Sequence, residues 1–120
     1  FAHFSYLLEI TDAISDEQFK WLKIAAKYVD KSHLTYKFVE NLHKYSEKNP
    51  RKVGEIFLEM LNSGTYPEYK KETIQAIVRN LYNAGEKEIA KIADRICNIY
   101  LDKGIKFLKD LYDENRENKK

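Results

Sequence analysis

The chain has 120 residues and a mass of 14.2 kDa, with 43% hydrophobic and 33% charged residues, which fits one packed domain and excludes two of ordinary size. Four glycines and two prolines are too few for a loop-rich or all-β fold, and the single cysteine excludes an intrachain disulfide and a zinc site built from cysteines. The formal charge is only +2 and lysines greatly outnumber arginines, which argues against sequence-specific DNA recognition because arginine reads bases better.

Apolar residues recur at helical spacing along almost the whole chain. We expect a short helix in residues 1–10, followed by a capping box at Ser15 and Gln18 that opens the next helix. The apolar stripe of this second helix is broad, because Trp21 and Tyr28 widen it. A stripe of such width predicts that the helix is buried from two sides.

Proline and glycine mark the boundaries of the later helices. A helix is expected over residues 32–48, and Asn49 is expected to cap the next one, with Pro50 at its first position. Thr65 and Pro67 are expected to open the fourth long helix.

Three long helices share the way in which they end. Each carries an apolar residue, two more apolar residues three and four places further on, an Asn or Asp, and a glycine two places later. Such a glycine stops a helix by adopting the left-handed conformation. The three glycines are Gly64, Gly85 and Gly104. Generic capping explains the pattern, and so does a degenerate two-helix repeat with units at about 17–48, 50–84 and 86–115.

The last apolar stripe lies in residues 105–112, and residues 113–120 are wholly polar. We therefore expect one helical domain over residues 1–112 and a mobile polar tail at 113–120. Because the chain begins with Phe1 and not with Met, we expect it to be a piece of a larger protein. No run approaches the roughly 18 apolar residues of a membrane span, and no signal peptide is recognised. With a single Cys97, these features predict a cytoplasmic protein without membrane association.

The stretch Asn49–Gly104 resembles HEAT-like helical repeats. It has a proline near a helix start, a pair of helices rich in Ile, Val and Leu, and a glycine at the turn, and it covers about half of the chain. The resemblance implies an all-α fold of five to six antiparallel helices in a short solenoid; an irregular bundle is the alternative. The second half is also similar in style to the C-terminal helical regions of large multidomain bacterial proteins, including NTPases and defence-system proteins, which transfers no catalytic residue.

Four lysines on the second helix recur at i, i+3, i+7 and i+11, and so share one side of it: Lys20, Lys23, Lys27 and Lys31. The stripe suggests a phosphate-binding face for nucleic acid, or a face for an acidic protein. The interpretation that we favour is a solvated outer face, because Glu17 and Asp30 partly neutralise it.

Aromatic residues make up 13% of the chain, and most lie on apolar stripes, where they are expected to fill the core. Tyr and Trp are also favoured anchors of protein interfaces. Five of them are candidates for an interaction surface: Trp21, Tyr28, Tyr36, Tyr66 and Tyr69.

No motif of catalytic chemistry is present. The chain lacks a Walker loop, a dinucleotide-binding glycine cluster and a nucleophile elbow. Its three histidines lack the spacing of a metal site, and Cys97 lies on an apolar stripe, where a buried and inert thiol is expected. We therefore expect a non-catalytic interaction, scaffold or regulatory domain without cofactor or metal, which docks on a protein partner or on other domains of its own chain. The alternative is a nucleic-acid-associated helical module that uses the lysine stripe.

Overall fold

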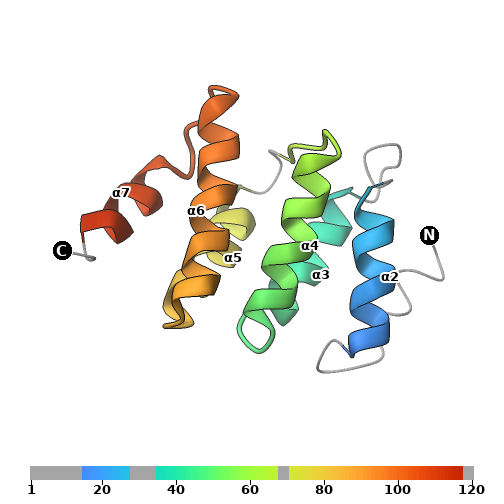
Figure 1. Ribbon diagram of the computed structural model, residues 1–120. Helices are drawn as coiled ribbons and strands as arrows, with labels where there is room; N and C mark the ends of the chain where they lie inside the picture. The colour runs from blue at the N-terminus through green and yellow to red at the C-terminus, as the bar shows by residue number, and fades with distance from the viewer. Residues whose placement is uncertain (1–14, 28–34, 68–70, 118–120) are drawn as a thin grey trace.

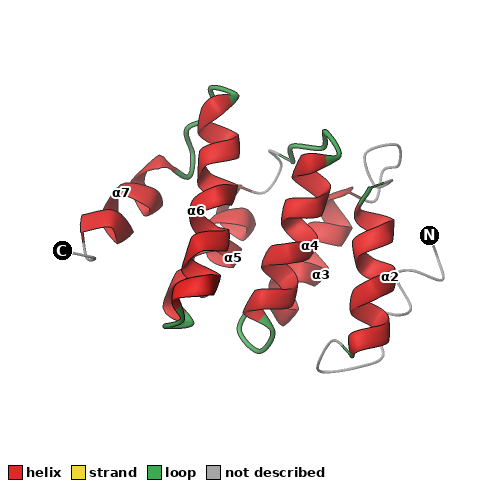
Figure 2. Ribbon diagram, in the orientation of Figure 1, coloured by secondary structure: helices red, strands yellow, loops and turns green. Residues whose placement is uncertain are grey.

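The computed structural model of the chain describes residues 15–27, 35–67 and 71–117, and for residues 35, 36, 116 and 117 it describes the backbone alone. Helices dominate this part, and no strand occurs in it (Figure 2). The six described helices are α2 Asp16–Ala26, α3 Thr35–Tyr45, α4 Pro50–Asn62, α5 Lys71–Asn83, α6 Lys87–Asp102 and α7 Lys109–Glu117. The all-α prediction is confirmed, while the short helix expected in residues 1–10 lies outside the described residues.

The helices are arranged in two rows (Figure 1). Helices α2, α4 and α6 form one row, in which α4 packs against both of the others, and α3, α5 and α7 form the second, in which α5 packs against both. Helices that follow each other along the chain, from α3 to α7, pack across the two rows. Among the described helices, alternate helices therefore share a row, with α2 at one end of the first row.

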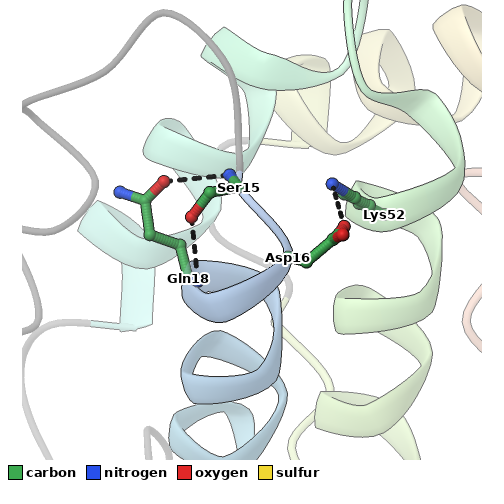
Figure 3. A network of polar contacts seen from close by, with 4 residues as sticks. All are labelled: Ser15, Asp16, Gln18 and Lys52. Atoms are coloured by element: carbon green, nitrogen blue, oxygen red, sulfur yellow. Dashed lines mark hydrogen bonds and ion pairs between the residues drawn. The ribbon is translucent and has the colours of Figure 1, made fainter.

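Helix α2 begins at the predicted capping box (Figure 3). The Ser15 hydroxyl accepts a hydrogen bond from the Gln18 backbone N–H at 3.1 Å, and the Gln18 side-chain oxygen accepts one from the Ser15 N–H at 3.0 Å. Two donors that a helix start leaves unpaired are thereby satisfied. Beside them, Lys52 Nζ of α4 lies 3.1 Å from Asp16 Oδ1, which ties the start of α2 to its neighbour in the row.

The start of α4 matches the prediction only in part. Pro50 is the first helical residue, as expected, but the Asn49 side chain makes no capping hydrogen bond, so the prediction that Asn49 caps this helix is wrong. The backbone explains the difference. Asn49 has φ −132° and ψ 54°, whereas Ser15 has the extended ψ of 164° that aims a capping side chain at the helix start.

The segment before α5 is described up to Pro67, and the described part of α5 runs from Lys71. Residues 68–70 lie outside the described residues, so the prediction that Thr65 and Pro67 open this helix stays a prediction. Both have partners there. The Thr65 N–H donates to the Met60 carbonyl at 3.2 Å, and the Pro67 carbonyl accepts a hydrogen bond from the Tyr100 hydroxyl at 2.7 Å. These bonds hold Thr65 against α4 and Pro67 against α6.

Helices α4 and α6 end in the same hydrogen-bonded turn. In each, the glycine N–H binds the carbonyl three residues back and the next N–H binds the carbonyl five residues back, at 2.9–3.2 Å. This is the Schellman arrangement, which needs a left-handed residue. Gly64 and Gly104 supply it with φ of 95° and 78°, and Gly85 after α5 has φ 77°. The predicted glycine stops are therefore confirmed.

Helix α7, at Lys109–Glu117, is shifted from the expected position over residues 105–112. It starts later and continues beyond 112 into the segment expected to be a polar tail. Local polar contacts support this extension: Lys109 Nζ lies 2.7 Å from Asp113 Oδ2, and the Asn115 amide donates to the carbonyl one turn earlier at 2.8 Å. Polar sequence therefore does not end the helix at 112.

One cluster of buried side chains joins all six helices. Tyr100 of α6 is fully buried in it, with its ring centroid 5.0 Å from that of Phe107 and 6.5 Å from that of Phe57. The cluster fixes α2 to the rest of the stack through Leu22 and Ala26, which are 1% and 0% exposed.

Candidate functional site

The inner side of α2 attaches the helix to the row. Leu22 and Ala26 are buried, and Phe19 is partly buried with Lys23 Nζ 5.4 Å and Lys52 Nζ 6.0 Å from its ring centroid. These apolar residues follow the helical repeat and form one stripe. This single stripe packs α2 against α4.

The outer side of α2 carries two exposed apolar side chains. Trp21 is 54% exposed and Ile24 is 43% exposed. Within the described residues, these two are the large hydrophobic side chains that are exposed to solvent. Their spacing of three residues places them next to each other on the helix surface. The expectation that α2 is buried from two sides is therefore wrong for Trp21, and among the described helices the main neighbour of α2 is α4. We call Trp21 and Ile24, with the flanking Lys20, the α2 outer face.

The lysines of the predicted stripe have different surroundings in the structure. Lys20 is exposed and takes part in none of the ion pairs that the structure describes. Lys23 lies over the Phe19 ring, and Lys27 Nζ lies 3.6 Å from Glu59 Oε1 of α4, while Lys31 lies outside the described residues. The lysines therefore do not act as four equivalent cations, since two of them already contact the fold.

Of the other aromatic candidates, the structure describes the side chain of Tyr66 alone, and it does not join the α2 outer face. Tyr66 is half-buried, its ring meets that of Tyr100 edge-on at a centroid distance of 6.5 Å, and Lys103 Nζ lies 5.2 Å from its centroid. It is thus part of the packing around α6. Tyr28 and Tyr69, as well as the side chain of Tyr36, lie outside what the structure describes.

Cys97 and Tyr82 meet where α6 packs against α5. The Tyr82 hydroxyl donates to Asp94 Oδ1 at 2.6 Å and lies 3.8 Å from Cys97 Sγ. Burial raises the pKa of the Cys97 thiol to about 12, and burial with the hydrogen bond to Asp94 holds the pKa of Tyr82 far above its ordinary value. Because the thiolate is the nucleophile, a thiol that stays protonated at neutral pH is unreactive.

Two further properties concern the described residues only. No three His, Cys, Asp or Glu side chains among them come together as metal ligands would. None of their helices combines the length and the apolar character needed to cross a membrane.

No protein-family model, no curated protein and no solved structure matches the chain. The relationship to HEAT-like repeats, and the likeness to the C-terminal helical regions of multidomain bacterial proteins, therefore remain predictions. The class that the fold defines is a two-row stack of helices, and its function has to be argued from its surface.

Sequence reasoning missed Ile24. It selected aromatic anchors and read α2 as a broadly buried helix, so an aliphatic residue one turn after Trp21 was not singled out. The signal that could have found it is the helical wheel: at about 100° per residue, Ile24 lies about 160° from Ala26, the centre of the stripe that Phe19, Leu22 and Ala26 form.

Proposed function

We propose that this chain is a non-catalytic interaction domain that docks on a protein partner, or on another domain of its own chain, through the α2 outer face. The observation that carries the proposal is the pairing of Trp21 and Ile24 on the solvent side of one helix. Exposed apolar surface costs about 25 cal/mol per Å² relative to its burial, and a neighbouring pair of this kind is a natural anchor for a partner.

Trp21 and Ile24 lie on a helix that the rest of the fold holds in place. Leu22 and Ala26 fix the inner side of α2 in the core, and the Ser15 capping box satisfies the backbone donors at its start. A partner would therefore meet a preformed helix, so little ordering entropy is lost on binding.

A nucleic-acid-associated module is the second candidate, and the exposed Lys20 is the observation that favours it. It has weaker support than docking to protein. Lys27 already has a carboxylate partner in Glu59, and the exposed Glu17 lies one turn from Trp21 on the same side of the helix, where it would repel phosphate.

The proposal is tested by photo-cross-linking. A benzophenone amino acid replaces Ile24, or the exposed Asn98 of α6 as the matched control, and the chain is irradiated in an extract of its source organism. We expect a protein adduct of defined mass at position 24 alone. The adduct is then identified and purified, and its affinity for the chain should fall about tenfold or more with Trp21→Ala and stay unchanged with Asn98→Ala.

Two results would contradict the proposal. Equal adducts from positions 24 and 98 would show that the α2 outer face has no preference for a partner. An adduct that disappears on nuclease treatment would establish the nucleic-acid module in its place.

A further inference from the structure

We draw no further inference here: the strongest candidate, the exposed apolar patch of Trp21 and Ile24 on the α2 outer face, carries nothing beyond the proposed function, because nothing in the structure shows what covers it.

Discussion

Ile92 of α6 packs against Gly54 of α4 so closely that a Cβ atom placed on Gly54 would lie 2.7 Å from Ile92 Cγ2. Gly54 is buried in the middle of its helix, where glycine is otherwise unfavourable by about 0.8–1.0 kcal/mol relative to alanine. The close approach explains why glycine is needed: it lets the backbone of α4 come near α6, its neighbour in the row.

Gly54→Ala should therefore destabilise the fold. The added methyl meets Cγ2 of a β-branched side chain, which is fixed close to its own backbone, and overpacking costs about 1–3 kcal/mol. Alanine has the higher helix propensity, which offsets part of this cost. The free energy of unfolding, measured in urea, should therefore fall by about 1–2 kcal/mol. In an Ile92→Ala background the same substitution should cost less, because the obstructing atom is gone. Equal costs in both backgrounds would show that the two residues are not coupled.

Tyr100→Phe should lower the free energy of unfolding by about 1–3 kcal/mol, because the buried Pro67 carbonyl loses the hydroxyl that donates to it at 2.7 Å. The matched control is Tyr66→Phe. The Tyr66 ring keeps its contacts with Tyr100 and Lys103 in that variant, so its stability should change by less than about 0.5 kcal/mol. Comparable losses in the two variants would argue against a special role of the Tyr100–Pro67 bond.

Ser15→Ala should lower stability by about 1 kcal/mol, because the Gln18 N–H loses its capping acceptor. Ser63→Ala is the comparison, since the Ser63 hydroxyl only donates to the Glu59 carbonyl at an exposed helix end and should matter little. Chemical unfolding measures both. A Ser15→Ala variant as stable as the parent chain would show that the box does not hold the start of α2.

Alkaline pH should weaken the fold through Cys97. The pKa of this thiol is about 12 in the folded chain and ordinarily 9.0, so the unfolded chain loses the proton first. The contribution of the protonated thiol to stability is therefore fully present below about pH 9 and declines as the pH rises toward 12. The urea midpoint of Cys97→Ala, measured from about pH 8 to about pH 11, should fall less steeply with pH than that of the parent chain. Val78→Ala, which removes no titratable group, should lower the midpoints and keep the slope of the parent chain.

Much of the fold could be predicted from the sequence, because helix patterns and stops are local. The Ser15 capping box and the stops at Gly64 and Gly104 depend on residues within one turn of each other, and they were located correctly. The two rows were not predicted, since they depend on pairings such as Gly54 with Ile92, which lie 38 positions apart in the printed sequence and carry no local signal.

The candidate site was only half predictable. Trp21 was recognised by residue type, whereas Ile24 was missed because an aliphatic residue on a mostly apolar helix reads as core. The role of Asn49 was misjudged for a related reason: a residue type favoured at caps does not determine the backbone conformation that capping requires.

The central claim is that the α2 outer face is open in the isolated chain, and acrylamide quenching of Trp21 tests it most directly. The chain has a single tryptophan, so all indole emission reports on this one position. Since Trp21 is 54% exposed, the account predicts a quenching constant of roughly half that of the urea-unfolded chain or more. A constant close to that of a buried indole would contradict the account, because it would mean that the face is covered before any partner arrives.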